Sequence, residues 1–381
     1  MKENNLNKVS KVSGKKVVVF LIASYERGGM ETVLNTVARD LLEQGVDVVY
    51  ILGKVRANNL AFPDGVKIHV VGDYIEPSDR TALKLASSIV KCRKKLISLS
   101  EIYRGATFVA ADMFWGWLSV SVRLNPLYLW LHFSITKLFA SSRTWRVNRR
   151  LFRHVDKIVV LGKSMQEEIS DLLGPSMLEK TVVIPNPLSI ISHDKLYAPG
   201  SKRFIYVGRL DNKSKRIDRI LKAFSILKDE SWRLVIIGNG PHREYLVELA
   251  ESLGVNNKIV WAGWQSDPWK YIKDNFGGVE ALLLTSDYEG YGMVLVEAMA
   301  NGIPCISTDC PTGPRDIIRN GENGFLISLS SEDAIVEELR KALEVILNGQ
   351  KTFDSFSMKR SSLDFSSEAV VQKWLYILEN T

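Results

Sequence analysis

Residues 285–307 read TSDYEGYGMVLVEAMANGIPCIS, and this stretch decides the fold class that we expect for the whole chain. A mostly apolar run, Val279 to Leu284, precedes it and has the length of a buried strand. After a glycine-containing loop, Met293 to Ala300 shows helical periodicity, and Ile303 to Ser307 is a second apolar run. The stretch therefore predicts a strand, a loop, a helix and a second strand, as in a parallel α/β sheet.

The start of this predicted helix is suited to binding a ligand. Backbone amides at a helix N-terminus are unpaired and bind phosphate or sugar oxygens, and Gly290 and Gly292 allow close approach to the backbone. Glu289 lies in the loop and Glu297 about one turn into the helix, so both could face such a ligand. Two carboxylates beside a phosphate site indicate hydroxyl recognition, most naturally of a nucleotide sugar. The alternative is an ordinary strand-to-helix turn with two solvated acids, and the spacing fits both.

The length and composition predict a soluble protein with two α/β domains. The chain has 381 residues, of which 46% are hydrophobic and 24% charged. No apolar run reaches the ~20 residues of a membrane span. The first 14 residues are basic without an apolar core, which predicts a disordered tail rather than a secretory signal. Cys92, Cys305 and Cys310 form no metal-binding pattern and are expected to be reduced cytosolic thiols.

Charge is unevenly divided between the two halves of the chain. Residues 1–195 contain 28 Lys/Arg and 18 Asp/Glu, whereas residues 196–381 contain 22 and 25. A basic first half beside a mildly acidic second half indicates that one domain meets an anionic surface. No nucleic-acid-binding motif is present, so we expect a membrane surface and no nucleic acid.

Apolar runs alternate with helical patterns along both halves, which predicts two Rossmann-like domains facing a cleft. Between them lies a segment with Pro185, Pro187, Pro199 and Gly200, where breakers at high density predict a linker. We expect one Rossmann-like domain at 15–195, a second at 201–365 and a final helix in 366–381 that crosses back to the first domain. The strands predicted in the first half are Lys16–Ala23, Val46–Leu52, Lys67–Val71, Thr107–Ala110, Leu127–Leu131, Lys157–Leu161 and Thr181–Ile184. Those predicted in the second half are Arg203–Val207, Trp232–Ile237, Lys258–Trp261, Val279–Leu284 and Ile303–Ser307.

Two cations follow the predicted strand that ends in FIYVGR. Arg209 and Lys215 would project at the carboxyl end of a parallel strand, where α/β ligands bind, and could hold a departing diphosphate. A solvated basic loop is the alternative. The chain contains no Asp-x-Asp pair, so we expect cations and helix amides in place of a metal, and no cofactor.

Three further features are weaker indicators of a binding site. Gly28 and Gly29 follow the first strand but lack the three-glycine dinucleotide fingerprint, so a tight turn explains them equally well. Residues 238–241, Gly-Asn-Gly-Pro, are weaker still. His132 lies where a strand ends, and contact with a reactant and a structural role are about equally expected.

The segment from Lys137 to His154 is the main candidate for a surface-binding helix. Its arginines at 143, 146, 150 and 153 would form one stripe on a helix, with apolar residues elsewhere on it. A basic amphipathic helix containing Trp145 is typical of a membrane-surface element. A core-packed helix with a solvated basic side is the equal alternative.

Together these residues resemble the retaining glycosyltransferases of the GT-B fold, family four, over nearly the whole chain. The specific motif is Glu-x7-Glu, present as Glu289 and Glu297. The resemblance implies that Arg209 and Lys215 bind the diphosphate and that Glu297 binds the ribose. It also implies that His132 lies beside the reaction centre and that Gly28 and Gly29 form the first-domain glycine loop. The remaining implied donor-sugar contacts are Glu289, Gly290, Tyr291, Gly292 and Met293. The resemblance implies as well that the domain at 15–195 is the acceptor-side domain and that the domain at 201–365 binds the nucleotide sugar.

A narrower resemblance, to bacterial lipopolysaccharide core α-1,6-galactosyltransferases, lies in WAGWQSDPW and TDCPTGPR. Two positions depart from the family pattern: Asn239 stands where relatives often have Asp, and Arg216 follows Lys215 where relatives have Gly. The resemblance implies a metal-independent, retaining transfer of galactose or glucose from a UDP-sugar to a lipopolysaccharide or another lipid-linked glycan. It places the protein at the cytoplasmic face of the plasma membrane. The alternatives are N-acetylhexosamine transfer in capsule, exopolysaccharide or teichoic-acid synthesis, a UDP-sugar epimerase, and a non-enzymatic basic membrane-associated protein.

Overall fold

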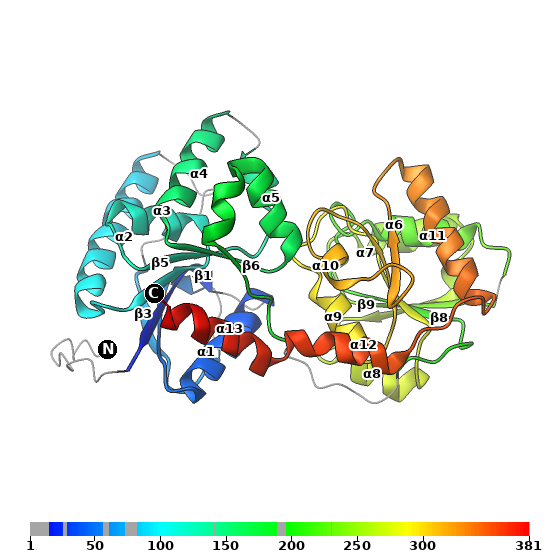
Figure 1. Cartoon of the computed structure of the whole chain (residues 1–381). Helices are drawn as coiled ribbons and strands as arrows, with labels where there is room; N and C mark the ends of the chain where they lie inside the picture. The colour runs from blue at the N-terminus through cyan, green and yellow to red at the C-terminus, as the bar shows by residue number, and fades with distance from the viewer. Residues whose placement is uncertain are drawn as a thin grey trace, which may run out of the picture. The chain divides into compact units, whose positions relative to one another are not determined.

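The computed structural model describes residues 15–25, 29–55, 61–72, 82–139, 142–188, 196–229 and 231–380. The predicted tail, residues 1–14, lies outside these ranges. The chain divides into two compact units (Figure 1). Unit 1 comprises Met1–Leu161, Glu168–Ser189 and Ser367–Thr381, and unit 2 comprises Gly162–Glu167 and Ile190–Ser366. Each is a parallel sheet with helices on both faces, which confirms the predicted fold class.

Unit 1 contains a seven-stranded sheet in the order β3-β2-β1-β4-β5-β6-β7. All seven strands were predicted. Most of them are apolar runs buried in a parallel sheet, whereas β3, at the edge of the sheet, is largely exposed. They are β1 Val17–Tyr25, β2 Asp47–Val55, β3 Lys67–Val70, β4 Thr107–Ala110, β5 Leu127–Trp130, β6 Lys157–Val160 and β7 Thr181–Val183. The helices of this part of the chain are α1 Gly29–Glu43, α2 Ala82–Ile102, α3 Met113–Ser121, α4 Ser142–His154 and α5 Lys163–Leu173, with 3₁₀ turns η1 Thr136–Phe139 and η2 Pro175–Lys180.

The last helix of the chain, α13 (Ser367–Glu379), is part of unit 1. Figure 1 shows α13 beside α1 on one face of the sheet, with α2, α3 and α4 on the other. The fully buried Trp374 of α13 packs against Phe20 of β1 and Trp130 of β5, with ring centroids 6.0 and 4.9 Å apart. The hydroxyl of Tyr128 donates to the carbonyl of Ile377 at 2.9 Å. Residues at the far end of the sequence therefore complete the core of the first sheet.

Unit 2 contains a six-stranded sheet in the order β10-β9-β8-β11-β12-β13. Five of the strands were predicted, and β13 was not, because its Gly-Phe-Leu-Ile run begins with a turn residue and reads as a continuation of the loop before it. The strands are β8 Arg203–Val207, β9 Arg233–Ile237, β10 Ile259–Gly263, β11 Ala281–Leu284, β12 Cys305–Thr308 and β13 Gly324–Ile327. The helices are α6 Ile217–Ser225, α7 Arg243–Ser252, α8 Pro268–Phe276, α9 Met293–Ala300, α10 Pro314–Ile317, α11 Glu332–Leu347 and α12 Ser355–Ser361, with η3 Asn256–Lys258 and η4 Ser362–Phe365.

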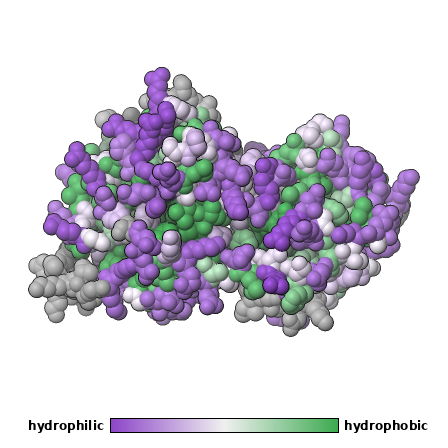
Figure 2. Space-filling view, viewed as in Figure 1, coloured by the Kyte–Doolittle hydropathy of each residue, from purple (hydrophilic) through white to green (hydrophobic). Residues whose placement is uncertain are grey.

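The face of the molecule in Figure 2 is mostly hydrophilic, with hydrophobic residues showing in smaller areas between the charged ones. Cys92, Cys305 and Cys310 are buried, and none of them is in a disulfide. Within the ranges that the structure describes, no helix has both the length and the apolar character needed to cross a bilayer.

Candidate functional site

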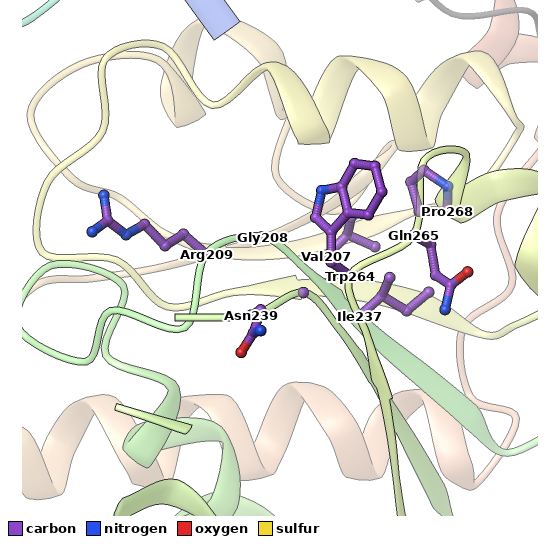
Figure 3. A pocket seen from close by; sticks show the side chains of 9 residues that line it. Val207, Gly208, Arg209, Ile237, Asn239, Trp264, Gln265 and Pro268 are labelled. Carbon is purple, nitrogen blue, oxygen red and sulfur yellow. The ribbon is translucent and has the colours of Figure 1, made fainter. Parts of the chain in front are cut away.

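A pocket of about 410 Å³ opens at the carboxyl ends of β8, β9 and β10 in unit 2 (Figure 3). Its floor is main chain, because Gly208 and Gly238 follow two neighbouring strands and lie in contact. A Cβ built on Gly238 would lie 1.8 Å from the carbonyl oxygen of Gly208. The Gly-Asn-Gly-Pro turn, which the sequence presented as a weak feature, therefore forms part of this pocket. The lining residues are Val207, Gly208, Arg209, Ile237, Gly238, Asn239, Trp264, Gln265 and Pro268.

An exposed tryptophan forms one wall of this pocket. Trp264 is 72% exposed, and in Figure 3 it stands over the strand ends that carry Val207 and Ile237. The side-chain nitrogen of Gln265 donates to the carbonyl of Ala262 at 2.9 Å, which fixes the loop beside it. A flat aromatic face over a main-chain floor is suited to a planar ring. The sequence interpretation quoted this loop only as part of a resemblance, since a tryptophan in a loop has no periodic pattern.

Arg209 lies at the opposite side of the pocket. Its side chain is exposed and in Figure 3 extends away from Trp264. The hydroxyl of Tyr206 donates to the carbonyl of Arg209 at 2.9 Å, so the backbone here is held while the guanidinium faces solvent. A guanidinium with an exposed fork next to a pocket can bind a phosphate in two places at once.

Lys215 and Glu289, 74 positions apart in sequence, form an ion pair. The Lys215 ammonium lies 2.6 Å from both carboxylate oxygens of Glu289. The Glu289 side chain is only 6% exposed and that of Lys215 is 25% exposed. The hydroxyl of Ser286 also donates to Glu289, at 2.5 Å. The structure thus brings together the cation and the acid that the sequence singled out separately.

Helix α9 begins where the sequence predicted. Gly292, at φ 84°, is its N-cap in a left-handed conformation, and no side chain caps the helix. In the described ranges, no hydrogen-bond acceptor is seen for the amides of Met293 and Val294. Tyr291 is buried, and a Cβ on Gly313 would meet its carbonyl oxygen at 1.9 Å, so the loop is packed from behind. These two amides at the N-terminus of α9 are therefore available to bind an anionic or polar ligand.

Glu297 lies one turn into α9 and is half-buried. Burial raises the pKa of its carboxyl to about 7, and the nearby indole of Trp269 lowers it to a smaller extent. Trp269 is fully buried, and its indole nitrogen makes no hydrogen bond of good geometry within the described ranges. Pro268 lines the pocket, and the next residue, Trp269, lies near Glu297. The first two residues of α8 therefore connect the pocket wall to Glu297.

In unit 1, His132 follows β5 by two residues, as predicted. The residue is half-buried, but its Nε2 atom is shielded from solvent and has no hydrogen-bond partner in the described ranges. Burial lowers the pKa of the imidazole to about 3, so the ring is neutral at physiological pH. Gly29 begins α1, while Gly28 lies outside the described residues.

The candidate surface helix begins later than the sequence suggested. Lys137 belongs to the 3₁₀ turn η1, and the α-helix α4 runs only from Ser142 to His154. Leu151 and Phe152 are fully buried, so α4 is packed into the core of unit 1. Its exposed side presents Arg146, Arg150 and Arg153 to solvent, and the side chain of Arg143 lies outside the described part.

Comparison with known proteins gives the same assignment for both halves of the chain. Residues 27–190 match the family described as Glycosyltransferase Family 4, and residues 191–347 match Glycosyl transferases group 1. The chain is 35% identical to the lipopolysaccharide 1,6-galactosyltransferase of Salmonella typhimurium, over 57% of this chain and 58% of the relative. It is 27% identical to an uncharacterized glycosyltransferase of Haemophilus influenzae over 96% of this chain and all of that protein.

Solved structures of similar fold include the apo form of the lipopolysaccharide outer core galactosyltransferase WaaB, with a TM-score of 0.80 at 24% identity over 96% of this chain and all of that one. Anabaena HepE, solved with UDP and glucose, has a TM-score of 0.70 at 18% identity over the same shares. The matches to the galactosyltransferases of Salmonella and Escherichia coli strain K12 span 58% and 54% of those relatives, just over half their length.

Two parallel-sheet domains, the second with a pocket at its strand ends and a Glu-x7-Glu helix, define the GT-B class of glycosyltransferases. The chain belongs to the glycosyltransferases of family 4 and group 1. The resemblance seen in the sequence is thereby confirmed, whereas the roles assigned to individual residues stay predictions.

Proposed function

We propose that the protein transfers a hexose, galactose or glucose, from a UDP-sugar to a lipopolysaccharide or another lipid-linked glycan, with retention of the anomeric configuration. The observation that carries the proposal is the Lys215–Glu289 pair, which joins a cation after β8 to an acid in the loop before α9. A relative named as a lipopolysaccharide 1,6-galactosyltransferase, 35% identical over 57% of this chain, supports the choice of sugar and acceptor.

In this proposal the donor occupies unit 2. The uracil ring stacks on Trp264 above the glycine floor, and the ribose hydroxyls donate to the Glu297 carboxylate. The diphosphate is held by Arg209, Lys215 and the free amides of α9, all of which supply positive charge. Glu289 and the backbone of Gly290 to Met293 bind the hydroxyls of the sugar. Each of these groups lies in one unit, so the donor site is preorganised.

Bond breaking places negative charge on the diphosphate oxygen that leaves the anomeric carbon. Arg209, Lys215 and the helix amides stabilise this charge as it develops. The departing oxygen then takes the proton of the acceptor hydroxyl, whose oxygen bonds to the anomeric carbon on the face that the diphosphate leaves. Retention follows from that geometry without a covalent sugar–enzyme intermediate. The neutral imidazole of His132 is proposed to contact the reacting sugar.

A screen of UDP-sugars tests the proposal. Purified protein is incubated with UDP-galactose, UDP-glucose and UDP-N-acetylhexosamines, with and without truncated lipopolysaccharide, and released UDP is measured. UDP release from a UDP-hexose that depends on the acceptor supports the proposal. Preference for an N-acetylhexosamine would favour the alternative transferase function, and free sugar product without acceptor would favour an epimerase. If the protein binds no UDP, the result would favour the alternative of a non-enzymatic, basic membrane-associated protein.

We propose further that the exposed arginines of α4 hold the protein to the anionic cytoplasmic face of the membrane. Each such side chain near an anionic surface contributes about 1 kcal/mol. The affinity for vesicles containing phosphatidylglycerol, measured by co-sedimentation, should fall about 30-fold or more in Arg146→Glu/Arg150→Glu. The matched control is Arg319→Glu/Lys270→Glu, at exposed positions of unit 2. Equal loss in both double variants would contradict a specific role for α4.

A further inference from the structure

A compact network of ionised side chains lies behind the Lys215–Glu289 pair in unit 2. Arg216 and Arg219, at the start of α6, bind Asp218, Asp287 and Glu332. These acids come from three places in the sequence: α6 itself, the loop between β11 and α9, and the first residue of α11. Glu332 accepts from both guanidinium groups, with its closest contact to each at 2.6 Å.

The network is buried on one side, at Arg219 and Asp218, whereas Asp287 and Glu332 are 40% and 47% exposed. The Arg219 side chain is 2% exposed, and it also donates to the carbonyl of Thr285 at 2.9 Å. Hydrogen bonds from the arginines lower the pKa of Glu332 to about 2, so its carboxylate stays ionised at physiological pH. Buried guanidinium groups need such partners, because an unpaired charge is costly at low solvent exposure.

Arg216 has a backbone conformation that its residue type disfavours. It lies at φ 48° and ψ 47°, the left-handed region that favours glycine. Its side chain makes five hydrogen bonds to the three acids of the network. These contacts offset the conformational cost, so Arg216 is anchored in a backbone conformation that a non-glycine residue rarely adopts.

The same contacts fix the two loops that carry the functional pair. Asp287, two residues before Glu289, is held by both arginines, and its amide donates to the carbonyl of Ser214 at 2.9 Å. The hydroxyl of Thr285 donates to the carbonyl of Arg216 at 2.8 Å. Lys215 lies between Ser214 and Arg216, so both of its chain neighbours are bonded to the segment that carries Glu289.

We infer that Glu332 is a positioning residue for the diphosphate site, acting through Arg216 and Arg219 to hold Lys215 and Glu289 at their working separation. This inference rests on the proposed function, because it takes the ligand of Lys215 to be the diphosphate of the donor. Glu332 touches neither donor nor acceptor in this scheme. It acts by holding the segment that carries Lys215, which limits the movement of the Lys215 ammonium group relative to Glu289.

The test compares Glu332→Gln with Asp333→Asn. Both residues are acids in the first turn of α11, so each substitution removes the same favourable charge from the helix N-terminus. Only Glu332 binds the arginines, and Asp333 has no hydrogen bond or ion pair in the described ranges. Titration calorimetry with UDP and with uridine separates positioning from folding, because only UDP has the diphosphate that Lys215 binds.

We expect Glu332→Gln to weaken UDP binding about tenfold while uridine binding stays within about twofold, and Asp333→Asn to change neither. Turnover should fall further than binding, by up to about 10²-fold, since a small displacement of a charged group weakens transition-state contacts most. Arg216→Gly and Arg216→Ala both remove the guanidinium, so both should reproduce the loss in UDP binding. Glycine adopts the left-handed conformation without strain, so the unfolding temperature of Arg216→Gly should be no lower than that of Arg216→Ala.

The possible results are distinguishable. Equal weakening of UDP and uridine binding, or unchanged UDP affinity in Glu332→Gln, would overturn the positioning role while wild-type UDP binding upholds the proposed function. If the wild-type protein binds no UDP, the proposed function fails, and this inference fails with it.

Discussion

The two units share a parallel-sheet layout but differ in what they bury. Among the described residues, four charged side chains are buried to 6% exposure or less, and all four, Asp218, Arg219, Glu280 and Glu289, lie in unit 2. The largest side chains buried in unit 1 are aromatic, with Trp115, Trp130 and Trp374 among them. Buried charges are costly unless they are paired, whereas buried aromatic rings stabilise directly. Three of the four buried charges, Asp218, Arg219 and Glu289, lie in the ion-pair network or the functional pair, so burial in unit 2 fixes polar groups at the candidate site.

The largest effect should come from the aromatic core of unit 1. Trp374→Ala removes a fully buried ring in contact with Phe20 and Trp130, so the opening free energy of β1 and β5 should fall by about 3–5 kcal/mol. Hydrogen exchange measures this strand by strand and should show β8 and β11 of unit 2 unchanged. Tyr376→Ala, at a 67% exposed position of the same helix, is the control. An equal increase in the hydrogen-exchange rates of both units would contradict the conclusion that Trp374 stabilises unit 1 alone.

Next in size is the loss of the acid of the functional pair. Glu289→Gln should lower turnover about 10²–10³-fold, because it removes a charged contact at the reacting sugar. The fold should be retained, since Lys215 is 25% exposed and can be solvated once its partner is neutral. Steady-state rates of UDP release provide the measurement. Glu322→Gln, 71% exposed in unit 2, should be unaffected, and near-normal turnover in Glu289→Gln would refute the assigned role.

Trp264→Ala should weaken UDP and uridine binding in parallel. Stacking of a base on an aromatic ring contributes about 1–3 kcal/mol, and Trp264 is 72% exposed, so its removal leaves the fold intact. Titration calorimetry distinguishes this change from the Glu332 variant, which should alter the ratio of the two affinities. Phe356→Ala on α12, also exposed, is the matched control. Unaltered uridine affinity in Trp264→Ala would place the base elsewhere.

The smallest effect concerns the pH dependence of ribose binding. Because burial raises the pKa of Glu297 to about 7, uridine affinity should fall by up to about tenfold per pH unit below pH 7 and level off above it. Uridine is used because it has no phosphate that titrates in this range. In Glu297→Gln, uridine affinity should not change with pH over this range. The same shift lowers stability as pH rises from 4.5 to about 7, since the unfolded chain releases this proton more readily.

The sequence predicted most of the fold because its strands are apolar runs separated by turn residues. It also identified Lys215 and Glu289, since both follow strand ends of unit 2. It could not predict their direct contact, nor the network behind them, because Arg216 and Glu332 are 116 positions apart and nothing local links them. Trp264 was missed for a different reason: an exposed aromatic residue in a loop has no periodicity.

The contribution of α13 to the first sheet has a consequence for biosynthesis. β1 is synthesised before unit 2, yet one of the rings that pack on β1 belongs to Trp374, which follows unit 2 in the sequence. We therefore expect the aromatic surface of Phe20 and Trp130 that Trp374 covers to stay exposed until unit 2 has been synthesised. A stop codon after Ser366 would spare every residue of the donor pocket, yet it would leave the N-terminal half of the polypeptide prone to aggregation.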